Sequence, residues 1–193
     1  MNTSMLRVAA VTAALLGLSM PALADFSGYY APANWTIGHL PDAPTDQGTV
    51  DPTMAPVSIT LNGSDTSPLA PSNFSRLNFT ITAPAAGQVS FNWSYLSNDS
   101  GPGFDPAGHL LNGATTQLTV DSGAFAQSGQ LSFNVTAGQA FGFYVLSNDN
   151  FGGNAVLTIS NFTAPIPEPA SVAMMSLGLL GIAGVAARRR RSK

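Results

Sequence analysis

The chain of 193 residues contains no cysteine, and charged side chains make up only 9% of it. Without cysteine, neither a disulfide framework nor a thiolate metal site can form. Basic residues are almost absent from the middle of the chain: Arg76 is the only one between Arg7 and residues 188–193. All nine aspartates lie in the middle segment 25–164, which therefore carries a charge of about −8. This balance argues against nucleic acid or anionic lipid as a partner, because both require a basic surface.

Helical periodicity is also missing from residues 25–164, where apolar and polar side chains alternate instead. Such alternation is typical of antiparallel strands with one buried face. It predicts strands at Val57–Leu61, Leu77–Ile81, Val89–Tyr95, Leu118–Val120, Leu131–Val135, Phe141–Phe143 and Ala155–Ile159. The turn signals between them are Asn62-Gly63, Ala86-Gly87, Asn112-Gly113, Ser128-Gly129 and Ala137-Gly138. We therefore expect an all-β domain, an antiparallel β-sandwich of seven to nine strands with jelly-roll or Greek-key topology.

The first 24 residues are typical of a secretory signal peptide. Arg7 supplies a positive charge, and Val8–Met20 is an uncharged apolar run. Ala22 and Ala24 then give the small-x-small pattern that signal peptidase requires. We expect cleavage after Ala24 and a mature chain that begins at Asp25, outside the cytoplasm.

The C-terminal part of the sequence has three segments. Residues 165–170 contain alternating prolines, which favour an extended backbone. Residues 171–187 carry no charge, and as a helix they would reach about 25 Å, close to the thickness of a bilayer's hydrocarbon core. The basic residues that follow are Arg188, Arg189, Arg190, Arg191 and Lys193. A basic cluster stays in the cytoplasm, so the pattern predicts a single-pass transmembrane helix with a stop-transfer tail at 188–193.

The order of these segments resembles a known sorting signal. Pro167, Glu168 and Pro169, followed by the apolar span and the basic end, are similar to the PEP-CTERM signal of Gram-negative bacterial surface proteins. The resemblance implies that a membrane peptidase of the exosortase type recognises the tail. It also implies passage from the inner membrane to the cell surface or extracellular matrix, and a link to exopolysaccharide or biofilm.

The middle of the chain has a resemblance of its own. The stretches that begin at Asp25, Phe91 and Gly142 are similar to an extracellular jelly-roll module of bacterial surface proteins. This resemblance implies a fold and no particular activity.

Two matching loops indicate a candidate cation site. Tyr95–Ser100 and Val145–Asn150 share the run Leu-Ser-Asn-Asp. If an even number of strand reversals separates these loops, both emerge at the same end of the sandwich. Asp99, Asp105 and Asp149 could then surround a hard cation such as calcium. The alternative is that the Asn-Asp pairs form Asx-turns at strand ends, and the sequence indicates no other cofactor.

Aromatic side chains offer an alternative function, the binding of glycans. Trp93 and Tyr95 alternate in step with Val89 and Phe91, so we expect them on the buried face of their strand. Trp35 and the pair Tyr29-Tyr30 are the better candidates for a platform on which sugars stack.

Signs of catalysis are weak. His39 and His109 are 70 residues apart in the sequence and have no clustered partner, so they make no zinc site. A Ser-His-Asp arrangement needs only to come together in space, so the sequence leaves it open, but no Gly-x-Ser-x-Gly elbow is present. Asp99 and Asp105 could be assigned to the two carboxylates that a glycosidase needs. We expect no enzyme but an exported, non-catalytic surface or matrix protein, whose partner is a neutral exopolysaccharide or another surface protein. A glycan-binding module is the alternative, and a secreted hydrolase is the least favoured.

Overall fold

The computed structural model describes residues 22–40, 48–65 and 74–167, together with the single positions Gly178, Leu180 and Arg188. Leu23–Ile166 forms one compact unit. In chain order its elements are β1 (Ala22–Ala24), η1 (Gly28–Tyr30), η2 (Pro32–Asn34), β2 (Thr36–Leu40), β3 (Thr49–Asp51), β4 (Ser58–Asn62), β5 (Ser75–Thr82), β6 (Gly87–Ser97), β7 (Ala107–Leu111), β8 (Ala114–Gln117), β9 (Ala126–Val135), β10 (Ala140–Ser147) and β11 (Ala155–Ile166). The two η elements are single 3₁₀ turns.

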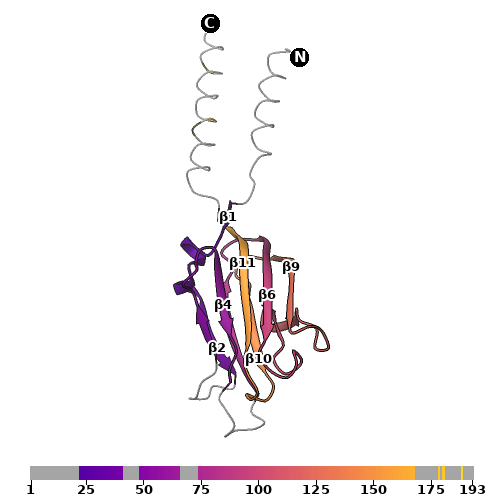
Figure 1. Ribbon diagram of the computed structural model, residues 1–193. Helices are drawn as coiled ribbons and strands as arrows, with labels where there is room; N and C mark the ends of the chain where they lie inside the picture. The colour runs from indigo at the N-terminus through magenta and orange to yellow at the C-terminus, as the bar shows by residue number, and fades with distance from the viewer. Residues whose placement is uncertain are drawn as a thin grey trace. The chain divides into compact units, whose positions relative to one another are not determined.

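The strands form two antiparallel sheets. One has the order β3-β4-β11-β6-β9, with β1 also paired to β11, and the other has the order β2-β5-β10-β7-β8. Figure 1 shows β4, β11, β6 and β9 side by side in the first sheet. Strands β4 to β11 pair first with last: β4 with β11, β5 with β10, β6 with β9 and β7 with β8. A long antiparallel ribbon folded in this way is a jelly roll. The predicted all-β sandwich is confirmed, with the jelly-roll topology.

The register of β11 determines which side chains enter the core. β11 lies between β4 and β6, with Leu157 opposite both Leu61 and Tyr95. Its alternation changes parity at a bulge between Ser160 and Thr163. Asn161 takes a left-handed conformation there, with φ of 48°. The bulge therefore turns Phe162 inward, where it is 2% exposed.

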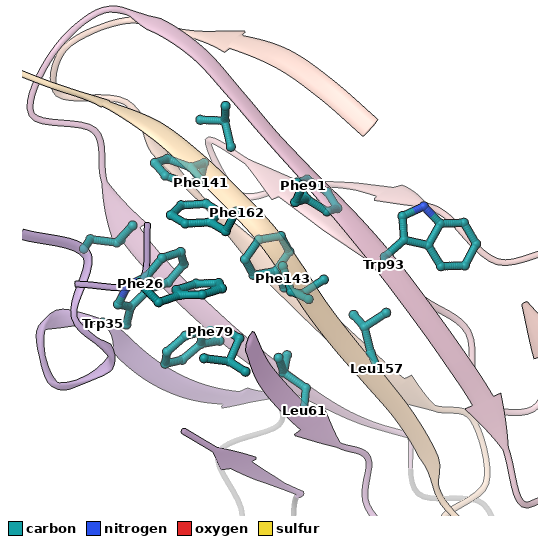
Figure 2. Close-up of a cluster of buried hydrophobic side chains, with 14 of the residues drawn as sticks. Phe26, Trp35, Leu61, Phe79, Phe91, Trp93, Phe141, Phe143, Leu157 and Phe162 are labelled. Carbon is teal, nitrogen blue, oxygen red and sulfur yellow. The ribbon is translucent and has the colours of Figure 1, made fainter. Parts of the chain in front are cut away.

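Aromatic rings fill much of the space between the sheets. Trp35 stacks on Phe79 with ring centroids 4.6 Å apart, and Phe26 stacks on Phe162 at 4.4 Å (Figure 2). The indole Nε1 of Trp35 donates to the backbone oxygen of Tyr30 at 2.9 Å. In a domain without disulfides, stability depends on the burial of such rings.

Most of the predicted strands are confirmed, but Leu118–Val120 is wrong. The strand of that region is β8, whose four residues are all exposed at the edge of the sheet. The Asn112-Gly113 turn that precedes it is confirmed: both residues have positive φ, 50° and 80°, and they join β7 to β8. β7 itself escaped prediction because Ala107–Leu110 is buried throughout and shows no alternation.

The predicted turn at Ser128-Gly129 is also wrong. These residues lie inside β9, where Gly129 is the cross-strand partner of Trp93 on β6. A β-carbon on Gly129 would lie 3.0 Å from the indole ring. The glycine therefore provides room for a large cross-strand neighbour and does not reverse the chain.

The ends of the folded unit lie close to the predicted segment boundaries. β11 continues past Ala164 to Ile166, and the Tyr30 hydroxyl donates to the backbone oxygen of Pro165 at 2.7 Å. Ala22–Ala24, which directly precede the predicted cleavage site, form β1. Phe26, the first core side chain, follows that site in the sequence. A chain that starts at Asp25 therefore keeps the whole aromatic core.

Several predicted segments lie outside the described residues. They are the signal peptide up to residue 21, Glu168 and Pro169, the span 171–187 apart from Gly178 and Leu180, and the basic tail 189–193. Within the described part of the chain, no helix has the length and apolar character needed to cross a membrane.

Candidate metal centre

The two loops that share the Leu-Ser-Asn-Asp run lie at the same end of the sandwich. We call residues 98–106 the β6–β7 loop and residues 148–154 the β10–β11 loop. Four strands, β7 to β10, separate them, so the number of reversals is even. In Figure 1 the arrow of β6 points toward the lower end, where β11 begins. The loops are bonded to each other: Asn98 N donates to Asn154 O at 3.1 Å, and Asn148 N donates to Phe104 O at 2.8 Å.

This arrangement brings the three predicted aspartates together. One carboxylate oxygen from each of Asp99, Asp105 and Asp149 lies within 4.8 Å of the other two. Asp105 is fully buried, Asp99 is 6% exposed and Asp149 is half-buried. The only basic residue of the segment 25–164, Arg76, stacks over the Tyr144 ring at 5.9 Å. Three acidic groups thus lie close together, two of them buried.

Asp99 and Asp149 each use one oxygen to order their own loop. Asp99 Oδ1 accepts hydrogen bonds from the backbone nitrogen of Ser100 and from its hydroxyl. Asp149 Oδ1 accepts from the backbone nitrogen of Phe151 at 3.2 Å, which is an Asx-turn. The other oxygen of Asp99, Oδ2, is buried and has no hydrogen-bond partner.

Asp105 has a different environment. Both of its carboxylate oxygens are buried without a hydrogen-bond partner of acceptable geometry. Burial, and then the charges of Asp99, Asp149 and Asp65, raise the pKa of Asp105 to about 7, although the nearby Ser147 hydroxyl partly offsets the rise. The Tyr95 hydroxyl fixes the backbone here by donating to Asp105 O at 2.8 Å. A buried carboxylate whose oxygens lack hydrogen-bond partners can accept a cation.

The other polar side chains at this end of the core are neutral. Ser75, Ser97, Ser147 and Asn150 are all buried. The Ser147 hydroxyl accepts from Asn150 N at 3.0 Å, and the Ser75 hydroxyl donates to Asn150 Oδ1 at 2.8 Å. These bonds stabilise the shape of the β10–β11 loop without supplying charge to the aspartates.

The predicted aromatic platform is wrong for two of its three members. Trp35 is 7% exposed and Tyr30 is fully buried, and both belong to the core. The two 3₁₀ turns, η1 and η2, place these side chains in the core. The sequence of this segment does not alternate, so it gave no sign of their burial. Tyr29 is 44% exposed, and Trp93 and Tyr95 are buried as predicted.

The two histidines do not meet. His109 on β7 is buried against Phe133, with ring centroids 4.9 Å apart, and its Nδ1 has no hydrogen-bond partner. Burial lowers its pKa. His39 lies on β2, opposite Leu77 of β5. His109 is therefore a packed core residue of the sandwich.

Of the predicted sorting residues, Pro167 is described and directly follows the last residue of β11. Arg188 is described as an isolated helical position, whereas Glu168, Pro169 and Arg189–Arg191 lie outside the described residues. The first residue of the Pro-rich segment, Pro165, belongs to β11 itself.

The chain is a jelly-roll β-sandwich followed by a sorting signal. Residues 165–191 match the PEP-CTERM protein-sorting motif, so the chain carries that motif. The match includes Pro167, Glu168, Pro169 and the four arginines 188–191. No curated protein matches the sequence.

Several solved structures are similar to the domain at low identity. One is a family 35 carbohydrate-binding module from Clostridium thermocellum, with 13% identity and a TM-score of 0.33 over 73% of this chain and 98% of that chain. Another is TmCBM61 in complex with β-1,4-galactotriose, with 12% identity and a TM-score of 0.39; the match covers 75% of this chain and 97% of that chain. A third is the enzymatically active domain of tailspike protein 4 of bacteriophage CBA120, with 16% identity and a TM-score of 0.37; the match covers 74% of this chain and 21% of that chain. The jelly-roll assignment rests on the strand pairing of this chain alone.

Proposed function

We propose that this protein is an exported, non-catalytic surface or matrix protein that an exosortase-type membrane peptidase processes. The observation that carries the proposal is the PEP-CTERM motif at residues 165–191, which begins within the last two residues of β11, the final strand of the all-β domain. In this proposal the signal peptide 1–24 directs export, residues 171–187 hold the chain in the inner membrane, and cleavage near Pro167-Glu168-Pro169 releases the domain. A role in exopolysaccharide or biofilm belongs to the same proposal.

The position of the motif supports this order of events. β11 ends at Ile166, and Tyr30 bonds the backbone at Pro165. A peptidase that cuts at or beyond Pro167 would leave every strand of the jelly roll intact. Replacing Pro167, Glu168 and Pro169 with alanine should therefore leave the domain folded and trap the protein in the membrane fraction. Normal release of the substituted protein would contradict the proposal.

Glycan binding is the second candidate function. Two phenylalanines, Phe104 and Phe151, are 44% and 51% exposed on the β6–β7 and β10–β11 loops. Exposed rings offer faces on which sugars stack. On a glycan array, the full chain in detergent should bind a neutral oligosaccharide, and Phe104→Ala with Phe151→Ala should abolish the signal. The control is Phe125→Ala, which removes a ring that is 49% exposed on another loop. No signal from the wild-type chain would rule out this candidate.

A hydrolase is the least supported function. The one carboxylate pair that sequence reasoning offered, Asp99 and Asp105, is 6% and 0% exposed. A glycosidase pair must flank a glycosidic bond in a site that a sugar chain can enter. The burial of both groups fits an ion site better than an open cleft.

A further inference from the structure

We propose that Asp99, Asp105 and Asp149 bind one calcium ion, which ties the β6–β7 loop to the β10–β11 loop. The distances between the three carboxylates fit such an ion. Calcium–oxygen bonds are about 2.3–2.6 Å long, so two oxygens on opposite sides of one ion lie roughly 4.6–5.2 Å apart. The observed oxygens lie within 4.8 Å of one another.

Three buried oxygens at this site have no hydrogen-bond partner of acceptable geometry. They are both carboxylate oxygens of Asp105 and Oδ2 of Asp99. A buried acceptor without a partner is costly, and a buried carboxylate more so. Asx-turns explain the bonds of Asp149 Oδ1 and Asp99 Oδ1, but they leave Asp105 unexplained. A cation between the loops would satisfy all three oxygens at once.

The ligand chemistry selects calcium among common ions. All three groups are hard oxygen donors, and 25–164 contains no cysteine that would favour a softer metal. Magnesium requires near-ideal octahedral geometry and keeps several waters. Asp105 instead offers two unpartnered oxygens of one carboxylate, an arrangement that suits bidentate ligation better than a regular octahedron. Calcium accepts irregular and bidentate carboxylates, and outside the cytoplasm it binds modules with Kd on the order of 10⁻⁴–10⁻³ M.

The ion would add to the hydrogen bonds that already join the two loops. Besides the two backbone bonds, Asn98 Nδ2 donates to Asn154 Oδ1 at 3.3 Å and Asn148 Nδ2 donates to Gly103 O at 3.0 Å. The β10–β11 loop approaches the β6–β7 loop through Gly152 and Gly153, which have φ of 94° and 128°. A β-carbon on Gly153 would clash with the backbone oxygen of Asn98. The backbones therefore already lie in contact, and the bound ion would stabilise this end of the sandwich.

The test is a calcium titration of the full chain purified in detergent and freed of metal with a chelator. Calcium chloride should raise Tm by several degrees, since a ligand that binds only the folded state stabilises it. Magnesium chloride should raise Tm less. Terbium, used as a luminescent calcium substitute, should be sensitised by Tyr95, whose hydroxyl bonds the backbone of Asp105, and calcium should quench this signal by displacement.

Asparagine variants decide whether the effect belongs to this site. Asp105→Asn and Asp149→Asn should each weaken calcium binding by at least about tenfold, because ligand charge sets affinity. In the metal-free chain Asp105→Asn should melt no lower than the wild type, because it removes a buried charge without a partner. The matched control is Asp51→Asn, an exposed aspartate on β3 whose loss should leave the response unchanged. If Asp105→Asn fails to fold, the half-buried Asp149 still decides the question.

Three results would overturn the proposal. One is the same Tm in calcium and in chelator. Another is a magnesium response as large as the calcium response, which would exclude calcium as the selected ion. The third is an unchanged calcium response in Asp149→Asn. Because these measurements use purified protein, they are independent of whether the chain is exported or processed.

Discussion

Gly152 lies directly against the carboxylate of Asp99: a β-carbon on Gly152 would stand 2.5 Å from Asp99 Oδ1. The glycine has φ of 94°, a left-handed conformation that favours this residue type. The same oxygen accepts hydrogen bonds from the backbone nitrogen and the hydroxyl of Ser100. Asp99 is thus held between its own loop and the neighbouring one, and its position depends on the absence of a side chain at 152.

The first prediction follows from this contact. Gly152→Ala should displace the Asp99 carboxylate, abolish the rise in Tm with calcium and lower the free energy of unfolding by about 1 kcal/mol or more. The matched control is Gly138→Ala, which has a similar φ of 83° and nothing within 4 Å of its β-carbon. That variant should show backbone strain alone and keep the calcium response. A full calcium response in Gly152→Ala would contradict the prediction.

The second prediction compares two phenylalanines of the core. Phe162→Ala should lower the free energy of unfolding by about 3–5 kcal/mol, since its ring is 2% exposed and stacks on Phe26. Phe133→Ala should cost less, because Phe133 is only half-buried on the edge strand β9. Denaturant unfolding of both variants measures the difference. A larger loss at Phe133 would show that the sheet edge, and not the aromatic cluster, dominates stability.

The third prediction concerns pH and His109. Burial lowers the pKa of His109 in the folded state, so below the unfolded pKa of about 6.5 the unfolded chain binds the proton more readily. Stability from this group is therefore present above pH 6.5 and is lost as pH falls toward the folded pKa. When the pH is lowered from 7.5 to 5.5, the free energy of unfolding should change less favourably in the wild type than in His109→Gln. The two proteins are compared because Asp105, whose pKa is raised, acts in the opposite direction in both.

Taking the difference between these two proteins isolates His109 from other groups that titrate, Asp105 among them. An identical pH dependence in the wild type and His109→Gln would contradict the assignment. The assignment would also be contradicted if the ring protons of His109, identified by their loss in His109→Gln, titrate in NMR at or above the ordinary pKa of histidine.

The sequence predicted those parts of the fold that depend on local alternation. β5 and β6 alternate cleanly because one face of each packs in the core. β7 is buried on both faces and β8 on neither, so neither shows the pattern. Ser128-Gly129 was wrongly predicted as a turn because the role of Gly129 depends on Trp93. Trp93 is distant in the sequence and lies opposite Gly129 only because β6 pairs with β9.

The candidate site was predictable in its members but not in its environment. The shared Leu-Ser-Asn-Asp run identified Asp99 and Asp149, but the sequence left the number of strand reversals between them open. Only three strands were predicted between the two loops, and the fourth, β7, makes the number even and brings both loops to one end. The complete burial of Asp105 depends on tertiary neighbours such as Tyr95. Local sequence carries no signal for such burial, and for the same reason Trp35 was misplaced on the surface.

The fourth prediction concerns membrane retention. Replacing Arg188, Arg189, Arg190 and Arg191 with alanine should reduce the protein in the inner-membrane fraction, because a basic cluster anchors the cytoplasmic end of the span. Cell fractionation and immunoblotting measure the effect. The control Arg76→Gln removes a basic charge from the domain and should fractionate like the wild type. Unchanged retention in the four-alanine variant would contradict the predicted topology.

The central claim is that the domain is delivered to the surface by cleavage at its sorting motif. Intact-mass spectrometry of the protein recovered from the cell surface or medium tests this most directly. The account predicts an N-terminus at Asp25, a C-terminus near Pro167-Glu168-Pro169 and the loss of residues 171–193. An extracellular protein that still ends at Lys193 would contradict it.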